Sequence, residues 1–190
     1  MGVELGILAA VVLGGVLLGF LAVVTYNHVV GLQRRCERAW ANIDVALKQR
    51  HDQLPNLVAA VRGQLGFEQQ VLGEVTRLRA AYSPGASVHD QAVLSEATSS
   101  AVRSLFALVE GYPELRSQQN VLALQEEIER LETLIARRRE LFNEQVYRYN
   151  RSVTTLPGLI LRPVFGWKTV ESFSAEEPER VRPAASLSTP

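Results

Sequence analysis

Residues 26–65 decide the fold of this chain, and they read YNHVVGLQRRCERAWANIDVALKQRHDQLPNLVAAVRGQL. Apolar side chains recur along this stretch, mostly at steps of three and four residues. They are Val29, Leu32, Cys36, Trp40, Ile43, Leu47, Leu54, Leu57, Val61 and Leu65. This spacing places them on one face of an α-helix, which has to be buried against other helices. Pro55 removes a backbone donor while the apolar period continues, so we expect it to kink the helix rather than end it.

An uncharged run lies just before this helix. Residues 5–24 read LGILAAVVLGGVLLGFLAVV, and a helix of that length spans about 30 Å, the thickness of a hydrocarbon core. A cleaved signal peptide is the competing interpretation. Glu4 stands where a signal peptide carries basic residues, and no convincing small-x-small cleavage site follows the run. We therefore predict a retained transmembrane anchor over residues 1–25, continuing almost directly into the next helix.

The basic residues near this run all follow it. Glu4 precedes the run, and the cations after it are Arg34, Arg35, Arg38, Lys48 and Arg50. The positive-inside rule therefore predicts a single-pass protein with its N-terminus outside and the rest of the chain in the cytoplasm. Arg34 and Arg35 lie close enough to the run to meet anionic lipid headgroups. Tyr26 lies at the membrane boundary, where an amphipathic ring is favoured.

Two glycines in the run, Gly15 and Gly19, have the small-xxx-small spacing that lets two membrane helices approach closely. Glycine is also common in membrane helices that do not pair. A homo-oligomer held together at these glycines is therefore one of two interpretations.

The rest of the chain is predicted to be helical, because no stretch alternates in the manner of a strand. Apolar periodicity indicates further helices from about residue 67 to 82, from 90 to 110 and from 115 to 155, with a loop at 83–87. Short connections between long helices are typical of an up-and-down bundle. The predicted fold is all-α: one N-terminal transmembrane helix continues into an elongated antiparallel four-helix bundle over residues 26–156.

An apolar and aromatic segment follows, over residues 157–173. In an antiparallel bundle the last helix returns toward the bilayer, so this segment is expected near the membrane. Its candidate membrane-interface residues are Arg162, Phe165, Trp167 and Lys168, with Trp at headgroup level and cations reaching the lipid surface. A flap that covers the base of the bundle is the alternative. Residues 174–190 carry little apolar surface and are predicted to be disordered.

Composition gives no support to an enzyme or a nucleic-acid-binding protein. Basic and acidic residues balance, with 20 of each, so no net positive charge attracts nucleic acid. The acid-rich helix around Arg137–Arg139 favours a solvated face over a nucleic-acid patch. Cys36 is the chain's one cysteine and lies on the apolar face, which favours a small core residue over a reactive thiol. The three histidines lack metal-ligand spacing, so we predict no catalytic residue, metal or cofactor.

His51 and Asp52 are the polar pair that comes nearest to a catalytic motif, and they carry the remote alternative of a hydrolase. Residues adjacent in sequence point to different sides of a helix. A solvated or capping pair is therefore the favoured interpretation.

Several short motifs, in order and at specific spacing, resemble the LemA family of bacterial membrane proteins. The matching stretches are Tyr26-Asn27, AWANIDV at 39–45, RHDQLPNLV at 50–58, YPEL at 112–115, LQEEIE at 124–129, Phe142-Asn143, Tyr149-Asn150 and Phe165-Gly166. The resemblance covers residues 26 to about 173. It implies an inner-membrane protein with one N-terminal span and a cytoplasmic helical bundle, without a known activity or cofactor. It also implies a gene that lies beside genes of membrane stress proteases, as genes of this family often do.

These observations favour a membrane-anchored helical scaffold or adaptor at the cytoplasmic face, which would organise copies of itself or other membrane proteins. The alternative is a lipid-contacting protein of membrane remodelling or envelope stress.

Overall fold

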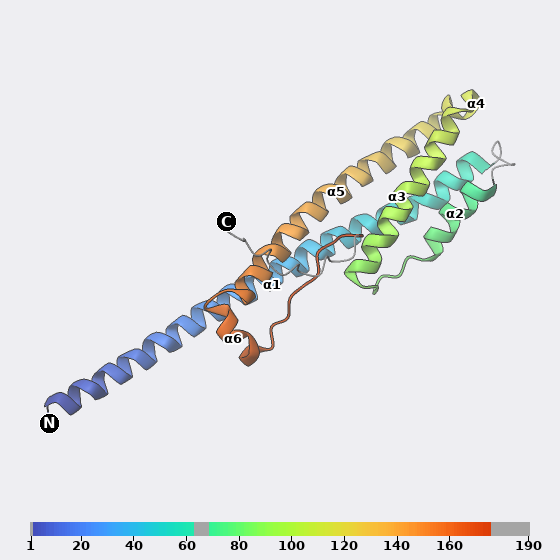
Figure 1. Cartoon of the computed structure of the whole chain (residues 1–190). Coiled ribbons are helices and arrows are strands. Elements are labelled where there is room, and N and C mark those ends of the chain that lie inside the picture. The colour runs from blue at the N-terminus through green and yellow to red at the C-terminus, as the bar shows by residue number, and fades with distance from the viewer. Residues whose placement is uncertain (1, 63–68, 176–190) are drawn as a thin grey trace, which may run out of the picture. The chain divides into compact units, whose positions relative to one another are not determined.

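The computed structural model describes residues 2–62 and 69–175, and all regular secondary structure in these residues is helical. The prediction of an all-α fold is confirmed. The helices of the described residues are α1 (Gly2–Arg62), α2 (Gln69–Ala80), α3 (Val88–Glu110), α4 (Pro113–Arg116), α5 (Gln119–Thr154) and α6 (Gly158–Phe165) (Figure 1).

The N-terminal apolar run and the amphipathic stretch after it form one helix, α1, as expected. Pro55 lies inside α1, which continues to Arg62. Among the described residues, α1 and α3 are long and apolar enough to cross a membrane. The apolar window of α1 is entirely exposed, whereas 39% of the α3 window is buried. α1 therefore has the exposure of a lipid-facing anchor, and α3 has that of a core helix.

The chain divides into two compact units, and α1 and α5 contribute to both. The anchor unit comprises Met1–Asn42 and Glu140–Glu171, and the core unit comprises Ile43–Arg139 with the described residues from Ser172 onward. The predicted boundaries at residues 25, 156 and 173 and the antiparallel order of the helices stay predictions.

The core unit is built around one apolar cluster to which α1, α2, α3, α4 and α5 all contribute. Its fully buried members include Leu57, Val61, Val75, Leu105, Leu115, Val121 and Ile128. Figure 1 shows α2 and α3 side by side in this unit. α3 begins after Ser87, whose hydroxyl accepts a hydrogen bond from the amide of Asp90 at 3.0 Å. Such a cap satisfies an amide that the first helical turn leaves without a backbone partner.

The anchor unit buries the first half of the α1 stripe and the last part of α5. Val29, Leu32 and Cys36 are buried on α1, and Phe142 and Tyr149 are buried on α5. The rings of Trp40 and Phe142 lie with their centroids 5.5 Å apart. Burial raises the pKa of the Cys36 thiol, which disfavours the reactive thiolate and agrees with a core role for Cys36.

The predicted helix over residues 115–155 is wrong at its start, because the structure divides it into α4 and α5. Ser117 and Gln118 separate the two helices. The Ser117 hydroxyl donates to the Glu114 carbonyl at 3.1 Å, and its amide donates to the Pro113 carbonyl. Leu115 of α4 is thereby turned into the core, where it is fully buried.

Some predictions fall on residues outside those that the structure describes. They are the start of the second helix near residue 67, the burial of Leu65 and the predicted disorder of residues 176–190. From Gln69 onward, α2 follows the expected stripe, with Leu72, Val75 and Leu78 buried.

Candidate functional site

The most buried charged residue that the structure describes is Arg50, on α1 in the core unit. It is 3% exposed, although it lies among the residues of the apolar stripe. At helical spacing, position 50 falls between Leu47 and Leu54 on the same face. The folding of α1 therefore carries a guanidinium group into the core with the neighbouring leucines.

Three residues from two other helices surround the Arg50 guanidinium. Nη1 donates to Glu132 Oε1 at 2.7 Å and to Ser99 Oγ at 2.9 Å. Nη2 donates to Ser95 Oγ at 3.0 Å and to the Ser95 carbonyl at 3.3 Å. The Ser99 hydroxyl in turn donates to Glu132 Oε2 at 2.8 Å. The polar cluster Arg50–Ser95–Ser99–Glu132 therefore joins α1, α3 and α5.

The composition of this cluster fits a structural role. A buried charge is tolerated when its partner and hydrogen bonds are in place, and here the carboxylate and both hydroxyls meet the guanidinium. The Glu132 side chain is one third exposed, so the pair is partly screened by water. A guanidinium stays protonated in proteins and does not serve as a general base. The cluster therefore joins three helices through one ion pair and its hydrogen bonds.

His51, the next residue, packs against α2 and its following loop. The imidazole and the Tyr82 ring have centroids 4.6 Å apart. The Tyr82 hydroxyl donates to Asp44 Oδ1 at 3.1 Å. Burial, together with the charge and hydrogen bond of Asp44, raises the pKa of Tyr82 to about 12. Burial and the nearby charge of Arg79 lower the pKa of His51.

This arrangement pairs His51 with an aromatic ring, while Asp52 is exposed on another side of α1. A hydrolase needs a base held against a nucleophile by hydrogen bonds. The described contacts of His51 do not provide that geometry, so the hydrolase interpretation gains no support from them.

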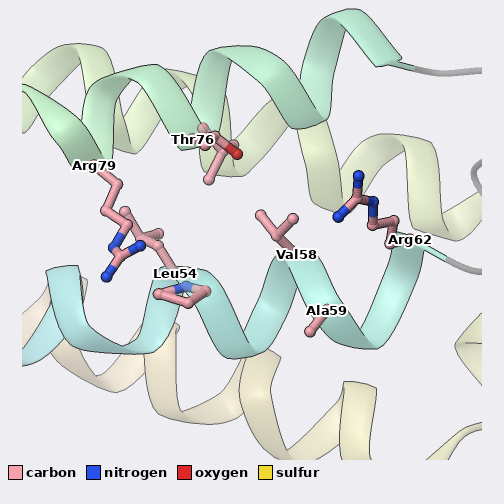
Figure 2. A pocket seen from close by; sticks show the side chains of 8 residues that line it. Leu54, Val58, Ala59, Arg62, Thr76 and Arg79 are labelled. Atoms are coloured by element: carbon pink, nitrogen blue, oxygen red, sulfur yellow. The ribbon is translucent and has the colours of Figure 1, made fainter.

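A hollow of about 410 Å³ lies between α1 and α2 in the core unit (Figure 2). It is lined by Leu54, Pro55, Val58, Ala59, Arg62, Val75, Thr76 and Arg79. Figure 2 shows Arg62 and Arg79 on either side of Val58. Because the lining combines apolar side chains with two arginines, the hollow suits a ligand that presents an apolar group beside an anionic group. Its lining contains no carboxylate, histidine or thiol that would do acid–base or nucleophilic chemistry.

The anchor unit holds a cluster of three aromatic residues, all predicted at the membrane interface. The Tyr26 ring lies 4.9 Å from the Phe165 ring and 6.2 Å from the Trp167 ring, measured between centroids. Phe165 and Trp167 stack with centroids 5.1 Å apart. Trp167 is only 8% exposed, whereas Tyr26 and Phe165 are exposed. The structure thus joins α6 and the residues after it to the part of α1 that follows the apolar run.

Close packing and paired hydrogen bonds hold α6 and the following residues in place. Gly158 is buried, and a Cβ added to it would lie 2.0 Å from the Ser152 carbonyl oxygen. Arg162 Nε donates to the Trp167 carbonyl at 3.2 Å, and the Trp167 amide donates to the Arg162 carbonyl. Gly166 ends the helix in the left-handed conformation, with φ at 65°, which glycine adopts without strain.

The Asn150 side chain fixes the segment after α6. Its Nδ2 donates to the Val170 carbonyl at 2.8 Å, and its Oδ1 accepts from the Val170 amide at 2.9 Å. Asn150 and Gly166 both belong to the short motifs described in the sequence. In the structure, Gly166 ends α6 and Asn150 binds the segment after it.

The other predicted site residues lie on exposed surfaces of the anchor unit. Arg34, Arg35 and Lys168 are exposed and Arg162 is half-buried. Gly15 and Gly19 have no atom within 4 Å of an added Cβ, so their face of α1 is open. Their predicted roles in lipid contact and helix pairing stay predictions.

The sequence alone does not reveal the Arg50 cluster. Arg50 was interpreted as one of the cations that follow the apolar run, and Glu132 lies in the acid-rich helix that was interpreted as a solvated face. The overlooked signal was a cation at a stripe position together with Ser95 and Ser99, which are four residues apart on one face of α3. Within the described residues, no three His, Cys, Asp or Glu side chains gather in a way that would hold a metal ion.

Comparison with protein families agrees with the features above. The model of the LemA family matches residues 39–186, which is most of the chain. The chain therefore belongs to the LemA family, which is not a known family of enzymes. The match begins after the apolar run and extends beyond residue 173, where the motifs seen in the sequence end. No curated protein matches the chain.

Proposed function

We propose that this LemA-family chain is a membrane-anchored helical scaffold or adaptor at the cytoplasmic face of the bacterial inner membrane. One observation carries the proposal. α1 is a single helix from Gly2 to Arg62, so the same helix supplies the exposed apolar run and part of the apolar cluster of the core unit. A helix that carries both ties the folded helices to the bilayer.

The surface of α5 supports this role. Its solvent-facing charges pair within the helix, as Glu127 does with Arg130 and Glu144 with Arg148. The exposed large apolar residues Leu122, Leu141 and Tyr147 lie on the same helix. Scattered apolar side chains among locally neutralised charges suit lateral contact with copies of the chain or with other membrane proteins, stress proteases among them.

Light scattering on the detergent-solubilised full chain, beside a chain shortened to residues 27–190, tests the proposal. We expect a defined mass that is a multiple of the single-chain mass. If the shortened chain keeps that mass, the helices outside the membrane make the assembly. If it falls to one chain, the membrane part with Gly15 and Gly19 makes it. A full chain that is strictly monomeric and co-purifies with no partner would contradict the scaffold role.

A lipid-contacting role in membrane remodelling is the second candidate function. The observation that favours it is the exposure of apolar side chains on α6, the helix that contacts Tyr26 through Phe165.

A further inference from the structure

We propose that α6 is an interfacial helix whose apolar outer face enters the headgroup region of the bilayer that α1 crosses. The outer face of α6 is defined here as Leu159, Ile160, Pro163 and Val164. The occupant that we assign to this face is lipid.

Aromatic contacts inside the anchor unit fix the position of α6 along the axis of α1. Tyr26 contacts Phe165, the last residue of α6, and Trp167, which follows it closely. Tyr26 lies two residues after the apolar run ends at Val24, which is about 3 Å along a helix axis. When the run fills the hydrocarbon core, Tyr26 is at the headgroup boundary. α6 is therefore held at the depth where a membrane-surface helix lies.

The exposed side of α6 is apolar. Leu159 and Pro163 are four residues apart, as are Ile160 and Val164, so the members of each pair lie in line along the helix, and all four are exposed. Ile160 is 66% exposed and Val164 is 73% exposed, and Leu156, just before α6, is exposed as well. The opposite side is turned inward at Gly158. A soluble helix normally places a polar side in water, whereas the side that α6 exposes is apolar.

The contacts that hold α6 prevent this face from turning inward. Gly158 lies against the Ser152 carbonyl, and the Asn150 amide binds the Val170 backbone through two hydrogen bonds. Such a preorganised apolar surface enters a bilayer without the cost of ordering a flexible segment.

Basic residues border the outer face. Arg162 lies within α6 and uses its Nε on the Trp167 carbonyl, and the exposed Lys168 follows. Cations at this level meet the phosphates of anionic lipids while their aliphatic stems lie along apolar surface. Continuity with the membrane-crossing part of α1 favours lipid as the occupant over a second copy of the chain.

Depth-dependent fluorescence quenching tests the proposal on the full chain. Cys36→Ala provides a background for single cysteines, and Ile160→Cys and Val164→Cys carry an environment-sensitive dye at exposed positions. The labelled chain is reconstituted into vesicles of phosphatidylethanolamine and phosphatidylglycerol that contain lipids with a nitroxide near the headgroup. We expect the dye at both positions to emit at a shorter wavelength than it does in water. We also expect the nitroxide lipid to quench most of this emission.

Two further positions serve as controls. Leu141→Cys lies on α5 of the same unit, is also apolar and exposed, and is about 20 Å of helix before the end of α5. We expect its dye to be quenched by aqueous iodide and not by nitroxide lipid. Leu13→Cys lies inside the apolar run and should be quenched by lipids that carry the nitroxide deep in their chains.

Three results would overturn the proposal, and they are distinguishable. Dyes at 160 and 164 that behave like the dye at 141 would place the face in water. Blue-shifted dyes that no nitroxide lipid quenches would show that protein covers the face. A dye at position 13 that no lipid quenches would remove the span itself, on which the proposal rests.

Discussion

Arg50 shows how far a single residue departs from what its sequence context predicts. By charge it belongs with the cations that follow the membrane anchor, and by position it belongs to the buried stripe of α1. The structure follows the position: Arg50 is buried and meets Glu132, Ser95 and Ser99. Periodicity predicted the face of α1 correctly, whereas the partners come from helices that no local pattern connects to it.

The first prediction concerns this pair. Glu132→Leu leaves a buried guanidinium without its carboxylate and should destabilise the chain by about 1–3 kcal/mol, because Glu132 is partly in water. Arg50→Met combined with Glu132→Leu should recover most of that loss, since apolar pairs replace buried ion pairs well. Thermal unfolding followed by circular dichroism provides the measurement.

Glu127→Leu is the matched control for this experiment, because Glu127 pairs with Arg130 on the same helix at an exposed position. Its effect should be much smaller than that of Glu132→Leu, because water screens an exposed pair. A double variant that is less stable than Glu132→Leu alone would contradict the expectation that apolar side chains can replace this buried pair.

The second prediction concerns His51. Burial and Arg79 lower its pKa in the folded chain, so the unfolded chain binds more protons between the lowered value and the ordinary value of about 6.5. Stability should therefore fall as pH drops through about 6.5, and His51→Gln should remove this part of the acid sensitivity. An NMR titration of the His51 ring provides the direct check. A pKa at or above the ordinary histidine value would contradict the proposed surroundings.

At the scale of elements, long helices with a regular apolar period were predictable and their interruptions were not. α1 was predicted to continue through Pro55, and it does. The break between α4 and α5 was missed, because the residues around Ser117 and Gln118 are all compatible with a helix. The break follows from the burial of Leu115, which is a tertiary effect.

α6 lies in the segment that was predicted to be apolar and aromatic, without a prediction of its secondary structure. The structure shows a helix of 8 residues with Pro163 inside it. Its position depends on the close approach of Gly158 to α5, which the sequence alone does not reveal.

The third prediction concerns this close approach. Gly158→Ala places a methyl group against the Ser152 carbonyl and should push α6 away, at a cost of about 1–3 kcal/mol. In a Trp40→Phe background, Trp167 is the one tryptophan that remains. We expect its emission to shift to the red as it loses its buried position.

Gly73→Ala is the control for this variant, because Gly73 lies inside α2 with no atom near an added Cβ. It should leave the Trp167 emission unchanged and preserve or slightly raise stability. Unchanged emission in both variants would contradict the role of Gly158 in positioning α6.

At the scale of the whole molecule, hydropathy and apolar periodicity were sufficient to predict the helical class and the N-terminal apolar helix, and short sequence motifs indicated the family. They did not predict that α1 and α5 each contribute to two compact units. Compact units depend on contacts between residues far apart in sequence, and periodicity reports only which face of a helix is buried. The predicted orientation across the membrane rests on the cations that follow the apolar run, and it stays a prediction.

The central claim is that α1 crosses the membrane and holds the folded helices at its cytoplasmic face. The most direct measurement is labelling of single cysteines by a membrane-impermeant maleimide in a Cys36→Ala background. Gly2→Cys, at the start of α1, should react in intact spheroplasts. Glu110→Cys, exposed at the end of α3, should react only after the spheroplasts are lysed. Reaction of Glu110→Cys in intact spheroplasts, or recovery of the chain in the soluble fraction, would contradict the claim.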